Sequence, residues 1–264
     1  MRFKLGRTGG RFKLGRNKPV ARQPMLRLNN YLLRTFPNPP PSIDYSPLAL
    51  PALHDVYGNS TAGNCTVAAA YHINATLLGN SAQTIPFVDQ DALTLYEQLS
   101  GWDGVEDSPS DVGLDEHQVL NYWAQTGLAP GGHRIVGFVE LAGHDAGEIQ
   151  AALWLFENVY RAGQLPQAWI DGMDAMDNGF VWDFAGPATE EGHAWMGFGY
   201  DQTGIKNDTW GFLGTETWAA VAKYGYTYTV LSEDLIDKAT QKAENGFNWT
   251  QLVSDLQSLG TIQT

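Results

Sequence analysis

The spacing of apolar and polar residues predicts helices mostly in the first half of the chain and strands mostly in the second. Residues 65–78 are apolar and almost uncharged, which is typical of a buried helix. Apolar residues recur at helical spacing in 89–99, 115–126 and 145–157, and 212–224 also looks helical. Strand patterns cover 133–141, the residues around Val159, 192–200, 207–210 and 224–231. This order indicates an α+β fold, with a helical half followed by an antiparallel sheet half.

Positive charge is concentrated at the N-terminus. Ten of the 16 Lys and Arg residues lie between Arg2 and Arg34, and the first acidic residue is Asp44. The rest of the chain holds six basic and 29 acidic residues, a balance of 6 − 29 = −23. A basic arm on an acidic body predicts that the arm docks on something negative: nucleic acid, a protein partner or its own body. The acidic body itself is a poor candidate for binding nucleic acid.

The arm contains a repeat, because Arg2–Arg7 and Arg11–Arg16 both spell Arg-Phe-Lys-Leu-Gly-Arg. Basic and apolar residues alternate as in an extended segment, and the glycines disfavour a helix. Two interpretations stay open: a disordered tail in the free protein, or an arm (residues 1–34) that adds a strand to a partner's sheet in an assembly. Residues 26–33 predict a short helix. The proline-rich segment 37–41 predicts a stiff linker between an extended N-terminal arm, 1–41, and a domain, 42–264.

Several classes of protein are disfavoured by composition. No apolar run approaches the roughly 18 residues of a membrane span, so no membrane partner is expected. The basic N-terminus lacks a following apolar segment, which argues against a secretory signal peptide and for a cytoplasmic or virion-associated protein. The single cysteine permits no internal disulfide. Histidines lack metal-ligand spacing and no phosphate-binding glycine loop is present, so neither a metal nor a cofactor is predicted.

Candidate chemistry centres on that single cysteine. Cys65 follows the turn-prone segment 59–64 and opens the apolar helix, and a helix N-terminus favours a thiolate. His193 heads the glycine-punctuated strand 192–200. A thiol on a helix and a histidine on a distant strand are the two halves of a nucleophile–base pair. The simpler alternative is that both are ordinary buried residues of the core.

The order of these motifs resembles that of the papain-like cysteine peptidases. Ser42-Ile43-Asp44-Tyr45 resembles the start of their mature domain, Asn59 to Cys65 the nucleophile segment, and Val112-Gly113-Leu114 the glycine strand beside the cleft. Gly192-His193-Ala194 resembles the histidine strand, and Asn207-Asp208-Thr209-Trp210-Gly211 resembles the Asn-Ser-Trp-Gly turn. More closely, the chain resembles a bacterial and phage group with Gly-Asn…Gly-Asp-Cys, Gly-His-Ala and Thr-Trp-Gly motifs. One departure is 212–224, which looks helical where the best-known enzymes have a glycine-rich strand.

The resemblance implies a role for each matching residue. Cys65 would attack a carbonyl carbon, and His193 would carry the proton to the leaving amine. Asn207 or Asp208 would orient the histidine ring, and Asn59 together with the Cys65 backbone N–H would stabilise the oxyanion. Gly113 would let a substrate backbone approach, and Trp210 would shield the histidine from water.

The predicted function is therefore a cysteine peptidase acting on peptide or isopeptide bonds of a peptide or protein substrate. Acyl transfer to an amine uses the same chemistry, and the sequence does not separate it from hydrolysis. The alternative is a non-enzymatic papain-like protein, for example a structural protein of a phage virion, whose basic arm binds neighbouring subunits. Nucleic acid contact is expected only through the arm.

Overall fold

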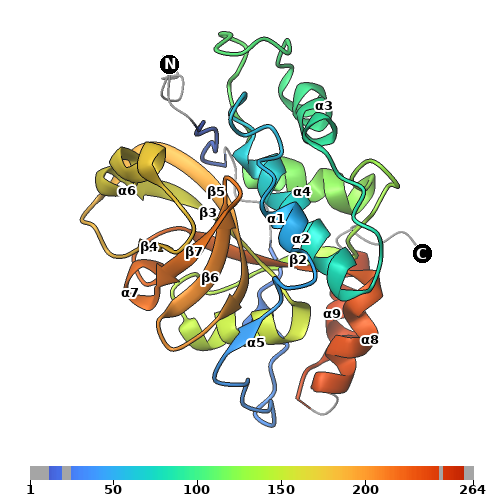
Figure 1. Cartoon of the computed structure of the whole chain (residues 1–264). Coiled ribbons are helices and arrows are strands. Elements are labelled where there is room, and N and C mark those ends of the chain that lie inside the picture. The colour runs from blue at the N-terminus through green and yellow to red at the C-terminus, as the bar shows by residue number, and fades with distance from the viewer. Residues whose placement is uncertain (1–11, 20–24, 244–245, 259–264) are drawn as a thin grey trace.

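The fold places a group of helices against one large, mostly antiparallel sheet (Figure 1). A computed structural model describes residues 12–19, 25–243 and 246–258. Within these ranges the sheet has eight strands in the order β2-β8-β3-β5-β6-β7-β4, and β1 pairs with β5. All strand pairs are antiparallel except β4 with β7, which is parallel. The α+β architecture predicted from the sequence, with helices and an antiparallel sheet, is therefore confirmed.

The elements have the following bounds. The strands are β1 Ile43–Asp44, β2 Gly137–Glu140, β3 Val159–Pro166, β4 Phe180–Trp182, β5 Ala188–Tyr200, β6 Gly204–Thr209, β7 Phe212–Thr217 and β8 Tyr226–Leu231. The α-helices are α1 Leu50–Leu53, α2 Cys65–Asn80, α3 Asp89–Ser100, α4 Glu116–Gln125, α5 Ala146–Phe156, α6 Gln167–Gly172, α7 Trp218–Val221, α8 Glu233–Lys242 and α9 Trp249–Ser258. Short 3-10 helices span Leu28–Asn30 and Met173–Ala175. None of the helices in the described ranges combines the length and apolar content needed to cross a membrane.

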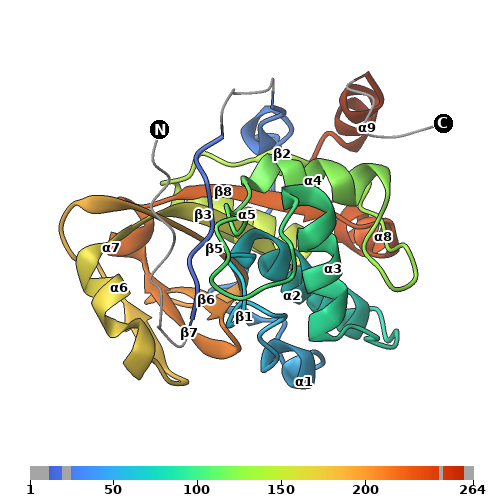
Figure 2. The ribbon, with the colours of Figure 1, turned by 90° about the horizontal axis from the view of Figure 1, so that it is seen from above.

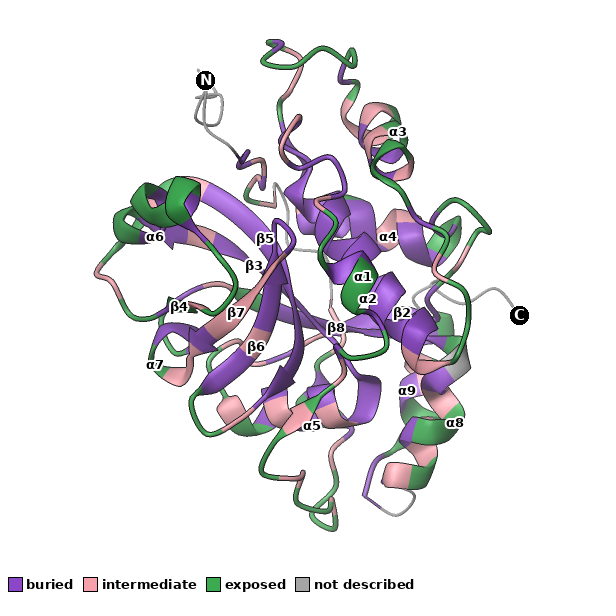
Figure 3. Cartoon of the chain, in the orientation of Figure 1, coloured by how far each residue is buried: buried purple, intermediate pink, exposed green. Residues whose placement is uncertain are grey.

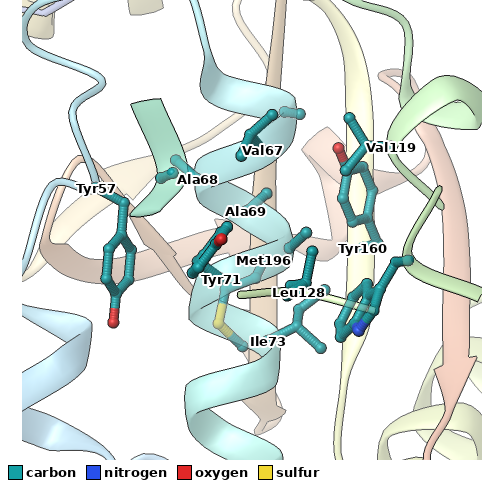
Figure 4. Close-up of a cluster of buried hydrophobic side chains, with 14 of the residues drawn as sticks. Tyr57, Val67, Ala68, Ala69, Tyr71, Ile73, Val119, Leu128, Tyr160 and Met196 are labelled. Carbon is teal, nitrogen blue, oxygen red and sulfur yellow. The ribbon is translucent and has the colours of Figure 1, made fainter. Parts of the chain in front are cut away.

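Helix α2 lies at the centre of the molecule, and its residues from Cys65 to Gly79 are all buried (Figure 3). Its apolar residues pack against β3 and β5 on one side and against helices α3 and α4 on the other. Figure 4 shows this cluster, with Tyr160 and Met196 from the sheet facing Val67 and Ile73 of the helix. A helix that is mostly apolar and almost without charge on every side is typical of such complete burial.

Two further clusters complete the interior. One lies between α5, α8, α9 and the sheet, and it includes Leu28 and Tyr31 from before the proline-rich segment. The other is aromatic and contains Trp169, Trp182 and Trp195, with the rings of Trp169 and Trp182 stacked 4.5 Å apart. The division of the chain into an arm, 1–41, and a domain, 42–264, stays a prediction.

Most of the predicted helices and strands are present. Asp115 and Asp145 cap α4 and α5, because their side chains accept hydrogen bonds from backbone N–H groups of the first helical turn. The expected helix over 212–224 is wrong for its first half, which is strand β7. Trp210 and Gly211 both have positive φ, 53° and 78°, and form the tight turn that folds β7 back onto β6. Only the short helix α7 follows.

Candidate functional site

The N-terminal arm lies directly across the predicted site. Residues 12–19, here called the arm segment, run between the helices on one side and the sheet on the other (Figure 2). The residues that contact them, here called the arm site, come from five parts of the chain. They are Asn59, Gly63, Cys65, Glu106, Asp107, Gly113, Leu114, Glu116, Gly192 and Trp210.

Backbone hydrogen bonds hold the arm segment on both sides. On the helical side, the N–H of Leu114 donates to Gly15 O at 3.0 Å and the N–H of Asn17 donates to Leu114 O at 2.9 Å. This is a parallel bridge between Arg16 and Leu114. On the sheet side, the N–H of Arg16 donates to Gly192 O at 3.2 Å. The arm thus pairs like an extra strand, but with its own body.

Charge also fixes the arm segment, because its cations pair with the acidic body. The Lys13 ammonium lies 2.5 Å from an Asp107 carboxylate oxygen. Arg16 donates two hydrogen bonds to Glu116, at 2.7 and 2.8 Å, and both side chains are completely buried. The charge asymmetry predicts three possible negative targets for the arm. In the described residues, the arm segment binds one of them, the acidic body of its own chain. Binding of nucleic acid or of a protein partner stays a prediction.

Cys65 is the first residue of α2 and is fully buried under the arm segment. The backbone N–H groups of Ala194, Gly15 and Thr66 lie near enough to its sulfur to favour the thiolate. Burial raises the pKa of the Cys65 thiol to about 12, although these N–H groups and the nearby Arg16 charge act in the opposite direction. In this conformation the sulfur is therefore a neutral thiol.

His193 lies in β5 next to Ala194, whose backbone N–H is near the Cys65 sulfur, and whether the two side chains form a catalytic pair stays a prediction. The ring of Trp210 stacks on the imidazole with centroids 4.0 Å apart. Burial lowers the pKa of His193 to about 3, so the ring is neutral. Its Nδ1 atom is buried without a hydrogen-bond partner among the described residues, and no hydrogen bond joins it to Cys65.

The residue that orients the His193 ring in the structure is Thr209, whose Oγ1 lies 2.6 Å from Nε2. The expected partners, Asn207 and Asp208, do not make this bond. Side chains alternate along β6, and Asp208 lies opposite Met196 in β5, on the face that packs against α2. There its carboxylate lies 3.3 Å from His72 Nε2. Asn207 is fully buried, and its side-chain amide has no hydrogen-bond partner in the described part of the chain.

Sequence reasoning missed Thr209 because the resemblance directs attention to an amide or a carboxylate. The alternation of strand residues was the signal that could have found it, because Thr209 and His193 lie on the same face of the β5–β6 pair.

Burial raises the pKa of Asp208 well above its ordinary value. Burial also lowers the pKa of His72 to about 4, so desolvation favours the neutral form of both neighbours.

Asn59 and Trp210 converge on a single carbonyl group of the arm. Asn59 Nδ2 and Trp210 Nε1 each donate to Lys13 O at 3.3 Å. Asn59 therefore points its amide at a peptide oxygen of the arm, and its role as an oxyanion donor stays a prediction. It also donates to Ala62 O at 3.0 Å, which fixes its orientation.

Gly113 has φ 72°, and a Cβ there would lie only 2.0 Å from Gly15 O. The arm backbone thus approaches Gly113 closely, whereas the approach of a substrate backbone there stays a prediction. The described residues contain no cluster of three or more His, Cys, Asp or Glu side chains that could hold a metal ion.

Comparison with known proteins finds similarity in structure alone. No family model matches the sequence, and no curated protein matches it either. Among solved structures, xylellain, a cysteine protease from Xylella fastidiosa, is 14% identical with a TM-score of 0.60. The match covers 87% of this chain and 99% of xylellain. The procathepsin B S9 of Trypanosoma congolense is 11% identical with a TM-score of 0.53, over 75% of this chain and 79% of that one.

Proposed function

Since the chain has the fold of the papain-like cysteine proteases, we propose that it is a cysteine peptidase in a latent form, with the arm segment covering its site. One observation carries the proposal. A thiol at a helix N-terminus, an amide donor and a tryptophan that stacks on a histidine all lie against the same extended peptide. Taken singly, each of these residues fits an ordinary core. Their arrangement around a bound peptide backbone is what favours catalysis.

The mechanism begins when the arm segment leaves and water enters. Exposure removes the burial that raises the pKa of Cys65 and lowers that of His193. A proton then passes from the thiol to the imidazole, and the helix N-terminus stabilises the thiolate. Thr209 orients the ring through Nε2, which leaves Nδ1 to receive and donate the proton.

The thiolate attacks the carbonyl carbon of the substrate peptide, and the carbonyl electrons move onto oxygen. The Asn59 amide and the Cys65 backbone N–H stabilise that oxyanion. His193 gives its proton to the leaving amine, which yields a thioester at Cys65. Water attacks the thioester with His193 as general base, and the thiol and a carboxylic acid are released.

The arm segment is bound as an inhibitor and not as a substrate. The carbonyl group that accepts from Asn59 belongs to Lys13, whereas the Cys65 sulfur interacts with the N–H of Gly15, two residues further on. The carbonyl group bound by the Asn59 amide therefore belongs to a different peptide bond from the Gly15 N–H that acts on the sulfur. This arrangement accounts for a peptide that lies beside the nucleophile without being cleaved.

The test compares full-length protein before and after displacement of the arm by the substitution Glu116→Gln, which removes its buried anchor. We expect hydrolysis of a denatured protein substrate by the Glu116→Gln protein, and none by the Glu116→Gln/Cys65→Ala protein. Rapid labelling of Cys65 without any hydrolysis would contradict the proposal.

The non-enzymatic assembly protein is the second candidate, and complete burial of both Cys65 and His193 favours it. In that case Cys65→Ala leaves the biological role unchanged, whereas deletion of residues 1–34 abolishes binding of the assembly partner. Loss of the role in Cys65→Ala would exclude this candidate.

A further inference from the structure

We propose that the arm site recognises the sequence Arg-Phe-Lys-Leu-Gly-Arg, and that the upstream copy, Arg2–Arg7, is a second occupant which exchanges with Arg11–Arg16 in the same molecule. The inference goes beyond the proposed function, because it concerns recognition of a sequence and requires no bond cleavage.

The first argument is that the arm site selects a residue type at each described position of the copy that it holds. Phe12 is 3% exposed, and it stacks on Trp210 with centroids 5.4 Å apart. Lys13 is 4% exposed and has Glu106 and Asp107 as counter-ions. Leu14 is 5% exposed within the aromatic cluster. The site therefore takes an aromatic, a cationic and an aliphatic side chain in that order.

The next two positions are more restrictive. A Cβ on Gly15 would lie 1.7 Å from Gly63 O, a distance that backbone atoms cannot accommodate. Only glycine fits at this position. Arg16 then donates two hydrogen bonds to the fully buried Glu116, in the fork geometry that arginine supplies and lysine does not.

The second argument is that the chain carries these residues twice. Phe3, Lys4, Leu5, Gly6 and Arg7 repeat Phe12 to Arg16 without a substitution. A site that accepts the downstream copy at every position meets the same groups in the upstream copy. Each contact described above is therefore available to both.

The third argument is that the connection is long enough. Eight residues, 17–24, join Arg16 to Met25, and 17 residues, 8–24, join Arg7 to Met25. Roughly doubling the number of connecting residues reduces the population of the closed form by a factor of about three. The downstream copy is thus favoured only modestly, and the upstream copy replaces it when it is blocked.

The test uses full-length variants and measures the rate at which iodoacetamide alkylates Cys65. Gly15→Val blocks the downstream copy, Gly6→Val blocks the upstream copy, and Gly9→Val is a matched control between the two. With a threefold preference, we expect Gly6→Val and Gly9→Val to react within about twofold of the wild type, and Gly15→Val about fourfold faster. The Gly6→Val/Gly15→Val protein should react at least 50-fold faster, on the order of the gain expected when a buried anchor is lost.

A Gly15→Val protein that reacts as fast as the double variant would overturn the proposal, as would a double variant that reacts like the wild type. Protection of Gly15→Val that appears only at high protein concentration would also overturn it, because the copy would then act on another molecule. As a second measurement, the free peptide Arg-Phe-Lys-Leu-Gly-Arg should restore protection to the double variant. A peptide with valine in place of glycine should not, and equal effects of the two peptides would refute recognition of the sequence.

Discussion

Replacing Glu116 by glutamine should release the arm while leaving the body folded. The Glu116 carboxylate accepts two hydrogen bonds from Arg16, and neither side chain is exposed to solvent. Loss of one partner of a buried ion pair costs about 3–5 kcal/mol, and the amide oxygen of glutamine still offers one acceptor worth about 1 kcal/mol. Arm docking is then weakened by about 2–4 kcal/mol, which raises the population of the open form about 30- to 900-fold.

The assay is alkylation of Cys65 under conditions where the rate follows the open population. The single cysteine makes the measurement specific without further substitutions. Glu190→Gln is the matched control, because it removes the partner of Lys18 from an ion pair whose side chains are 57% and 89% exposed. A surface pair of this kind should change the rate by less than about fivefold. Equal rates for the Glu116→Gln and Glu190→Gln proteins would refute the argument that the buried pair anchors the arm.

Three further predictions follow from the described contacts. In the Glu116→Gln background, Thr209→Val should lower kcat/KM about 10- to 100-fold and alter the pH profile of kcat/KM, because the Thr209 hydroxyl is the group that reaches His193. Thr209→Ser keeps the hydroxyl and should retain both the value and the pH profile. An equal loss in the two variants would indicate a packing role instead. Burial lowers the pKa of His193 to about 3, so the contribution of this residue to folding stability is present above pH 6.5 and is lost as the pH falls toward 3. Urea unfolding should therefore show that the free energy of unfolding of the wild type falls by about 2 kcal/mol relative to that of His193→Asn between pH 7 and pH 5. Parallel pH profiles of the two proteins would contradict this. Arg161 forms a buried ion pair with Glu216, so the substitution Arg161→Met should destabilise the fold by about 3–5 kcal/mol in thermal unfolding. The Arg161→Met/Glu216→Leu protein should recover most of that loss. A double variant no more stable than Arg161→Met would contradict this prediction.

Elements with strong local signals could be predicted from the sequence. The apolar run after Cys65 is helix α2, and Asp115 and Asp145 cap the helices that follow them. These features depend on neighbours within one or two turns, so the residues that determine them are adjacent in the chain. The order of motifs also identified the architecture, although each motif taken alone was weak.

Features that depend on long-range pairing were harder to predict. Strand β7 has no clear alternation, and it forms because the turn at Trp210 and Gly211 places it beside β6. The bond between Thr209 and His193 depends on the register of β5 against β6, and strand alternation indicates only which residues of β6 share a face, not which of them lies beside His193. The position of the arm segment depends on Glu116, exactly 100 positions away in sequence from Arg16.

Glycines 63, 113 and 192 lie far apart in sequence, yet all of them leave room for the same stretch of backbone. A methyl group at position 113 or 192 would lie 2.0 or 2.1 Å from a carbonyl oxygen of the arm, and one at position 63 would lie 3.1 Å from another. A genetic screen for variants in which the arm no longer covers Cys65 should therefore return substitutions at codons that are scattered in sequence. The substituted residues should lie close together in the structure. Natural substitutions are subject to the same coupling. A change at any of these three codons alters the docking of the arm and the accessibility of Cys65 together.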